Sequence, residues 1–147
     1  MNEIIIRPML AEDIEDVLAV EVLSFSTPWS QDAFESEITN KLAYYLVLED
    51  NRQVIGYAGM WLILDEAHIT NIAIIPQYRR SGLGEKLLLE MIQKAKLHGA
   101  ASMTLEVRVS NNAAQCLYEK LGFEKRGIRK QYYTDTKEDA LIMWAEF

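Results

Sequence analysis

Glu106 and Tyr118 are the residues whose types and spacing point most directly to chemistry. They lie in the stretch LEVRVSNNAAQCLYEKLGF, residues 105–123. Apolar residues alternate from Leu105 to Val109, which predicts a strand with these side chains inward and Glu106 on its other face. The asparagines and alanines that follow predict a helix that carries Tyr118 and ends at a glycine. A carboxylate can accept a proton and a phenol can donate one, so the pair indicates acid–base chemistry if strand and helix bring the two together.

Each side chain also has an ordinary structural interpretation. Glu106 alternates with apolar residues, so it could be the solvated face of an edge strand. Tyr118 lies at helical spacing from Ala114 and Leu121, so it could be a phenol that only packs the helix. Taken singly, the structural and the chemical interpretations are equally supported for each residue.

A glycine-containing stretch, PQYRRSGLGEKLL (residues 76–88), favours the chemical interpretation of both residues. Arg79 and Arg80 precede a Gly-Leu-Gly turn, and a helix is expected from Gly82 to about Leu97. Glycines let the backbone turn tightly and present successive N–H groups outward. The helix start adds unpaired donors and a positive dipole end, so the loop predicts an anion site with arginine charge for phosphate oxygens.

Other glycine motifs do not fit this stretch. A P-loop requires Gly-Lys-Ser or Gly-Lys-Thr, but Gly84 is followed by Glu85 and Lys86. The dinucleotide fingerprint requires a third glycine where the chain has Leu87. A helix entry with two solvated arginines remains the structural alternative for an isolated Gly-x-Gly. The arginine pair between a strand and a helix favours anion binding.

The expected elements form a mixed α/β order without an internal boundary. Strands are expected at 4–7, 43–49, 54–64, 68–75, 105–109, 125–132 and 140–146. Helices are expected at 11–24, at 30–38 with Ser30 as the cap, at 82–97 closed by Gly99, and from the asparagines at 111–112 to Gly122. Helices packed on one sheet are the expected architecture. No repeat, low-complexity segment or Pro/Gly/Ser-rich linker interrupts the chain, so residues 1–147 are expected to form a single domain.

At this point the sequence resembles a known family. The string Arg79-Arg80-Ser81-Gly82-Leu83-Gly84 is similar to the acyl-CoA pyrophosphate loop of the Gcn5-related N-acetyltransferases (GNAT). The resemblance covers nearly the whole chain, from IRPM to DALIMW. Within the superfamily it is strongest to the bacterial ribosomal-protein alanine N-acetyltransferases, through FSTPWS, NIAIIPQYRRSGLG, LEVRVSNNAAQCLYEKLGF and YYTDTKEDALIM. Thr134 departs from the pattern, because relatives often carry proline there.

The resemblance implies a GNAT fold, with a central, mostly antiparallel twisted sheet of about seven strands and about four helices on both faces. It implies acetyl-CoA as the co-substrate. It also implies an N-terminal peptide of a ribosomal protein as the acceptor, namely the N-terminal alanine of small-subunit ribosomal protein eighteen. Glu106 aligns with the family's proton acceptor and Tyr118 with its proton donor.

The resemblance also assigns binding residues. It assigns cofactor contacts to Ile72, Ala73, Ile74, Arg79, Arg80, Ser81, Gly82, Leu83, Gly84, Glu85 and Asn111. It places Phe25, Trp29, Tyr132 and Tyr133 around the acceptor peptide. Only backbone pairing is expected of 72–74, and Asn111 is a helix N-cap by position whatever else it does.

Three further positions keep two interpretations. Trp29 could contact the acceptor or only cover the core. Arg108 could steer phosphates or solvate the strand, and solvation is favoured. Glu138 and Asp139 could receive a cationic peptide or simply be solvated.

Acetyl transfer from a thioester to an amine matches the Glu–Tyr pair. A free α-amine has a pKa near ~7.8, so a carboxylate base can suffice. A thiol leaves with a pKa of ~8.5, within reach of a phenol donor if the site lowers the phenol's own pKa. No Ser or Cys has a base partner in its sequence context, so direct transfer is expected. Acetylation of a lysine or a small-molecule amine, and a non-catalytic acyl-CoA-binding module, are the rival interpretations.

Composition excludes several other classes of protein. The 147 residues are half apolar and carry a net charge of −7. This charge argues against nucleic acid and suits an amine partner, although mild acidity is also common for solubility alone. Cys116 is the only cysteine, and His68 and His98 are not spaced as zinc ligands, so neither a disulfide nor a metal site is expected. The N-terminal stretch lacks signal-peptide features and the apolar runs are too short to span a bilayer, so a cytoplasmic protein without a membrane partner is expected.

Overall fold

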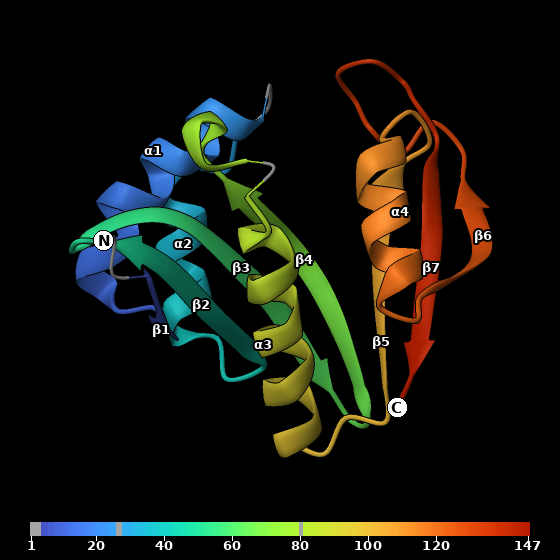
Figure 1. Cartoon of the computed structure of the whole chain (residues 1–147), viewed down its shortest axis with the longest axis horizontal. Helices are drawn as coiled ribbons and strands as arrows, with labels where there is room; N and C mark the ends of the chain where they lie inside the picture. Colours follow the sequence, from blue (N-terminus) through green and yellow to red (C-terminus); the bar gives the residue numbers. More distant parts are fainter. Residues whose placement is uncertain (1–3, 26–27, 80) are drawn as a thin grey trace.

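A seven-stranded, mostly antiparallel sheet forms the centre of the molecule (Figure 1). The computed structural model describes residues 4–25, 28–79 and 81–147. The strands are β1 (Ile4–Pro8), β2 (Ala43–Asp50), β3 (Gln53–Ile63), β4 (Glu66–Ile74), β5 (Ser102–Arg108), β6 (Glu124–Arg129) and β7 (Ala140–Glu146). They lie in the order β1-β2-β3-β4-β5-β7-β6, and only the β4–β5 pair is parallel.

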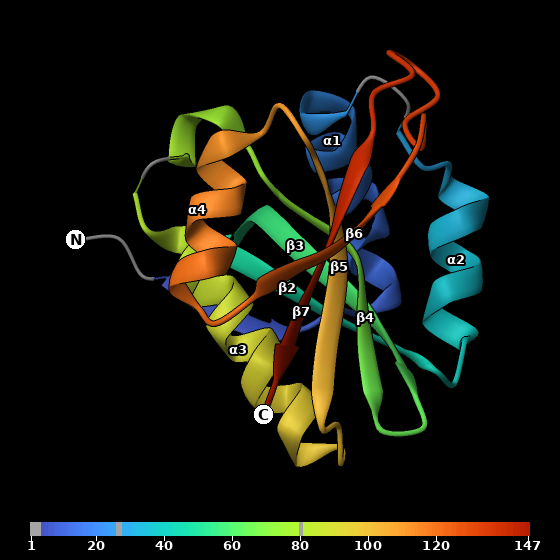
Figure 2. The same cartoon turned by 90° about the vertical axis from the view of Figure 1, so that its right-hand side faces the viewer.

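Helices cover both faces of this sheet, as Figure 2 shows edge-on. On one face, α1 (Ile14–Ser24) and α2 (Gln31–Thr39) pack a core that includes Val17, Phe34 and Tyr57. On the other face, α3 (Leu83–Leu97) and α4 (Asn112–Lys120) pack a second core that includes Leu88 and Met143. Short 3₁₀ turns precede α1 (Ala11–Asp13) and follow β4 (Pro76–Tyr78). The expected GNAT-type arrangement of sheet and helices is confirmed.

The two halves of the sheet part between β4 and β5. These strands pair only from Glu66 to His68 and from Ser102 to Thr104. Beyond that point a register shift in the β3–β4 pairing leaves Thr70 as an extra residue in β4. A β-bulge bends its strand and increases the local twist. The second half of β4 therefore diverges from β5, as Figure 1 shows, and both strands keep an unpaired edge there.

The ends of the helices follow local sequence signals. The Ser30 hydroxyl accepts the Ala33 N–H at 3.2 Å and begins α2. Gly99 and Gly122 adopt left-handed φ values of 88° and 98° just after α3 and α4, where a residue without Cβ avoids strain. These caps confirm the boundaries that serine and glycine predicted.

Three local expectations were wrong. The first helix begins as a 3₁₀ turn and becomes α-helical at Ile14. Val109 lies beyond the end of β5 and its side chain is 39% exposed, so it does not point into the core. β6 ends at Arg129 rather than at 132. Gln131 has a left-handed φ of 51°, and its backbone N–H donates to the side chain of Asp139. This contact turns the chain out of the sheet.

A buried carboxylate connects α1 to the sheet. Glu21 lies on the buried face of α1, 1% exposed, and accepts a hydrogen bond from the hydroxyl of Tyr57 in β3. Its other oxygen accepts the backbone N–H of Trp29 at 2.7 Å, beyond the end of α1. Burial raises the pKa of Tyr57, so the phenol stays a donor. One side chain thus ties the α1–α2 connection to the middle of the sheet.

Among the helices of the described residues, none is long and apolar enough to cross a membrane.

Tyr57→Phe should lower the free energy of unfolding by about 1–3 kcal/mol, because it leaves a buried carboxylate oxygen without its donor. Tyr45→Phe is a matched control, since Tyr45 stacks on Tyr57 and its hydroxyl contacts Thr70 at 3.3 Å rather than Glu21. Urea unfolding of both variants would measure the difference. Equal losses would show that the Tyr57–Glu21 bond carries no special share of the stability.

Candidate active site

A pocket of about 290 Å³ opens where β4 and β5 part. Its walls come from four regions that are distant in the sequence: the end of α1 with the following loop, the bulged part of β4, the end of β5 with α4, and the loop between β6 and β7. The lining residues are Glu21, Phe25, Trp29, Ile69, Thr70, Asn71, Ile72, Leu105, Glu106, Val107, Arg108, Asn111, Tyr118, Tyr132 and Tyr133. Glu106 and Tyr118 therefore line the same pocket.

The carboxylate of Glu106 lies on β5 at the point where this strand has lost its pairing with β4. Its side chain is 25% exposed, and one oxygen lies 3.5 Å from Nε of Arg129 in β6. β5 lies between β4 and β7 in the sheet, but at Glu106 it pairs only with β7. The strand therefore has a local edge at this residue, and Glu106 lines the pocket that opens there.

The ring of Tyr118 is part of the core, and the residue also lines the pocket. The residue is 7% exposed, and its ring centroid lies 5.9 Å from that of Phe123. The packing interpretation therefore holds for the ring. No described residue forms a hydrogen bond with the hydroxyl, and Tyr118 lines the pocket.

Burial raises the pKa of Tyr118 to about 12. A lowered phenol pKa was the condition set for full proton donation to the thiol, and burial shifts the pKa of Tyr118 in the opposite direction. The physical reason is that a phenolate in this position would lose its hydration and gain no compensating positive charge. The phenol consequently stays protonated at all ordinary pH values, which suits a hydrogen-bond donor.

The unpaired edge of β4 exposes backbone groups along the approach to the pocket. Ile75 donates its N–H to Ile55 of β3 at 2.9 Å. Pairing alternates along an antiparallel ladder, so Ala73 also faces β3 whereas Ile72 and Ile74 turn their N–H and C=O groups away from it. The Ile74 carbonyl accepts Nε of Arg79 at 2.9 Å. Of the three residues expected to pair through their backbone, Ile72 and Ile74 are placed to do so.

The glycine loop lies at the far end of this edge. Gly82 is the N-cap of α3 with φ of 81°, a conformation that suits glycine. Leu83, Gly84 and Glu85 then form the first helical turn, whose amides have no carbonyl of the same helix to pair with. An ideal Cβ on Gly84 would lie 3.7 Å from the side chain of Ile74, so the loop and the β4 edge are adjacent.

The loop's polar side chains make contacts within the chain. Ser81 donates to the carbonyl of Tyr78, and Glu85 pairs with Lys120 of α4 at 3.1 Å. Arg79, besides its bond to Ile74, donates to the Ser24 hydroxyl at 3.3 Å. Arg80, which was expected to bind phosphate, lies outside the described residues.

Two loops contribute the four aromatic residues predicted to surround the acceptor peptide. Trp29 packs on Phe34 with ring centroids 5.3 Å apart, so it covers the core and lines the pocket at once. Phe25 is 38% exposed beside it. Tyr132 and Tyr133 stand edge to face on the opposite wall, with centroids 5.1 Å apart. The four predicted aromatic residues thus face one opening.

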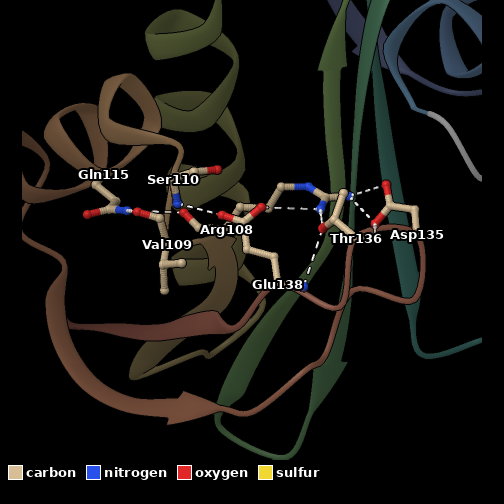
Figure 3. A network of polar contacts seen from close by, with 7 residues as sticks. All are labelled: Arg108, Val109, Ser110, Gln115, Asp135, Thr136 and Glu138. Atoms are coloured by element: carbon tan, nitrogen blue, oxygen red, sulfur yellow. Dashed lines mark hydrogen bonds and ion pairs between the residues drawn. The ribbon is translucent and has the colours of Figure 1, made fainter.

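Charged side chains around the second loop are already engaged. Glu138 accepts the backbone N–H of Ser110 at 2.7 Å, and Asp139 accepts that of Gln131 at 2.9 Å. These hydrogen bonds hold the pKa of both carboxyls below the ordinary value. Both carboxylates are thus held in place by the chain itself, and neither is merely solvated. Arg108, expected to be merely solvated, is the centre of a polar network (Figure 3).

The structure brings together some of the predicted residues and separates others. One group of predicted residues lines the pocket: Glu106, Tyr118, Ile72, Asn111, Phe25, Trp29, Tyr132 and Tyr133. A second group lies outside the pocket lining, toward the start of α3: Ala73, Ile74, Arg79, Ser81, Gly82, Leu83, Gly84 and Glu85. The two groups lie along the same edge of β4. Asn111 also caps α4, accepting the Ala114 N–H at 3.1 Å.

Sequence reasoning missed Glu21, Asn71 and Arg108 as lining residues. Glu21 interrupts the apolar face of a helix and Asn71 interrupts an apolar strand. A polar residue in such a position is a usable signal, because burying it requires a partner.

Comparisons with known proteins agree with this architecture. The acetyltransferase (GNAT) family profile matches residues 14–123. A protein of Bacillus subtilis (strain 168) is 49% identical over 140 residues, covering 95% of this chain and 93% of the relative; its name assigns it provisionally as a ribosomal protein bS18-alanine N-acetyltransferase. The ribosomal protein bS18-alanine N-acetyltransferase of Escherichia coli (strain K12) is 40% identical over 133 residues, covering 89% of each chain.

Solved structures are similar over the whole length. The crystal structure of the ribosomal-protein-S18-alanine N-acetyltransferase from Escherichia coli superposes with a TM-score of 0.90 at 38% identity, covering 99% of this chain and 94% of that one. Ard1 from Thermoplasma volcanium superposes with a TM-score of 0.86 at 25% identity over 97% of both chains. The predicted acetyl-CoA-dependent transferase class is confirmed by these matches. With the profile covering most of the sequence and relatives aligned nearly end to end, the chain belongs to the GNAT family of acetyltransferases.

Proposed function

We propose that this enzyme moves an acetyl group from acetyl-CoA to the N-terminal amine of a protein, and that its acceptor is the N-terminal alanine of ribosomal protein bS18. The names of the relatives support this acceptor. A ribosomal acceptor would place the reaction in the cytoplasm.

One observation carries the chemical part of the proposal: a single pocket holds a carboxylate, a protonated phenol and two aromatic loops beside a free strand edge. The edge of β4 at Ile72 and Ile74 can pair with an amide-bearing chain such as the pantetheine arm. The start of α3 can hold the pyrophosphate. The acyl end then reaches the pocket between Glu106 and Tyr118.

In this mechanism Glu106 accepts the proton that the amine nitrogen loses as the amide bond forms, directly or through a water molecule. The Nε of Arg129 lies 3.5 Å from one oxygen of this base. The C–S bond of the thioester breaks as the C–N bond forms. The net reaction moves one proton from nitrogen to sulfur.

Tyr118 acts at the leaving sulfur. Complete proton transfer from a phenol of pKa about 12 to a thiolate of pKa ~8.5 would be uphill by about 5 kcal/mol. Its main contribution is therefore a hydrogen bond that stabilises the sulfur as negative charge develops. The burial that makes the phenol a poor acid also keeps it protonated for this role.

Gly84→Val should raise the acetyl-CoA dissociation constant at least ~10-fold, or about 1.4 kcal/mol, because the side chain would block approach to the helix start. The fold should tolerate it, since a Cβ at Gly84 meets only the end of the Ile74 side chain. Gly82→Val is a less clean test, because φ there is 81°. Gln93→Val, an exposed position later in α3, is the matched control. Titration calorimetry showing parent-like affinity in Gly84→Val would remove the loop from the site.

Glu106→Gln and Tyr118→Phe should retain acetyl-CoA affinity while turnover falls about 10²–10⁴-fold. The Glu106 variant should recover partly at higher pH, because more of the amine is then deprotonated. Tyr44→Phe, outside this pocket, is the control for loss of a hydroxyl. The acid–base assignment is wrong if both variants turn over like the parent.

The pH dependence gives a second check on the same pair. With its pKa at about 12, Tyr118 should cause no alkaline loss of activity below about pH 11. A loss near pH 9 in the parent that disappears in Tyr118→Phe would contradict this protonation state.

An Ala-initiated peptide should be acetylated at its α-amine, and the same peptide with a blocked N-terminus and a free lysine should be a poor substrate. An α-amine is about half deprotonated near pH ~7.8, whereas lysine at pKa ~10.4 is almost wholly charged at neutral pH. Mass spectrometry of both reactions measures the preference. Equal rates for the two peptides would assign the protein to lysine or general amine acetylation. If no amine gives a product, the interpretation as a non-catalytic acyl-CoA-binding module is favoured.

A further inference from the structure

Arg108 holds the loop that forms one wall of the acceptor site (Figure 3). We name residues 130–139, between β6 and β7, the acceptor loop. Nη2 of Arg108 lies 3.1 and 2.9 Å from the two carboxylate oxygens of Asp135, and Nη1 donates to the Thr136 hydroxyl at 3.2 Å. Nη1 also lies 3.6 Å from a carboxylate oxygen of Glu138. One side chain from β5 thus reaches three residues of the acceptor loop.

The contacts require the shape of arginine. The guanidinium lies over the ring of Tyr133, with 4.0 Å between its central carbon and the ring centroid. A planar guanidinium can stack on a ring while its separate nitrogens reach different partners, here Nη2 to Asp135 and Nη1 to Thr136, and a lysine ammonium lacks both the plane and the second nitrogen. The side chains of Arg108, Asp135 and Glu138 are 29%, 18% and 19% exposed, so water screens the network only in part. The guanidinium of Arg108 therefore restrains Tyr133 by contact with one face of its ring.

The same network reaches the start of α4. Glu138 accepts the N–H of Ser110 through its second oxygen, next to the N-cap of α4. Gln115 of α4 donates to the carbonyls of Arg108 and Val109 at 3.1 and 2.9 Å. The acceptor loop and the helix that carries Tyr118 are therefore tied to one point at the end of β5.

The acceptor loop has little regular structure of its own. It contains no strand or α-helix, and Gln131 and Lys137 have left-handed φ values of 51° and 59°. Tyr133 donates its N–H to the carbonyl of Glu138 at 3.2 Å. Loops of this kind keep one conformation only where the surrounding structure restrains them, and Arg108 supplies a large share of those restraints.

We propose that Arg108 is a positioning residue for the acceptor: it sets the places of Tyr132 and Tyr133 over the pocket and thereby controls peptide affinity, without binding the cofactor phosphates. This inference rests on the proposed function, because it assumes that these tyrosines contact the incoming chain end. It assigns to the network a role in KM for the peptide rather than in acetyl-CoA affinity.

The test compares Arg108→Lys, which keeps the charge and loses the planar contacts, with the parent. The peptide KM should rise at least ~10-fold, with the acetyl-CoA dissociation constant within ~2-fold of the parent. Arg126→Lys is the matched control, since Arg126 in β6 pairs only with exposed carboxylates of Glu124 and Glu146 among the described residues. A rise in the acetyl-CoA dissociation constant with an unchanged peptide KM would overturn the proposal and make Arg108 a phosphate ligand.

A partner variant keeps the test independent of how Arg108→Lys folds. Asp135→Asn should also raise the peptide KM, and the double variant should lose less than the product of the two single effects, because both remove one contact. If the increases in peptide KM of the two single variants multiply in the double variant, Arg108 and Asp135 do not act through one contact, and the proposal is overturned.

Hydrogen exchange separates this inference from the proposed function. Amides of the acceptor loop should exchange faster in Arg108→Lys than in the parent, whether or not any peptide is acetylated. A parent enzyme that acetylates no α-amine would refute the proposed function, whereas unchanged exchange in the variant would refute the positioning role.

Discussion

The early end of the β4–β5 pairing is the constraint on which the site depends. Among the strands of the described residues, β4 and β5 are the only parallel neighbours, and they stay together for three residues on each strand. The bulge at Thr70 then bends β4 away while its pairing with β3 continues to Ile74. A sheet that stayed paired would have no unpaired backbone at Ile72 and no space above Glu106.

The opening needs walls, and these come from both faces of the sheet. On one side Glu21 ties the loop after α1 to Tyr57 in β3. On the other side Arg108 ties the acceptor loop to β5. Each anchor is a charged group with its partners arranged around it, in a place where an unpartnered charge would be costly. These polar anchors restrain the segments that carry Trp29 and Tyr133.

Much of this arrangement could be predicted from the sequence. Alternation and helical spacing predicted nearly every element, because most elements bury part of their surface in the core. Ser30, Gly99 and Gly122 predicted helix boundaries because their roles are local. The quoted motifs, through family resemblance, predicted which residues share the pocket.

What could not be predicted depends on contacts between distant segments. The high pKa of Tyr118 follows from burial of its ring between α4 and the sheet, which residue type alone does not reveal. Arg108 was taken for a solvated side chain because its partners lie in a loop far along the chain. β6 was predicted too long because the end of the strand is set by Asp139, across the loop.

The most direct measurement of the central claim is NMR-detected amide exchange at Ile72 and Ile74, with and without saturating acetyl-CoA. The free edge of β4 predicts fast exchange at both amides in the unliganded protein, although both lie within a strand, and marked slowing once acetyl-CoA is bound. Residues of the paired part, such as Ala67, should be protected in both states. Fast exchange that persists at full acetyl-CoA saturation, or protection that is already complete without it, would contradict the account.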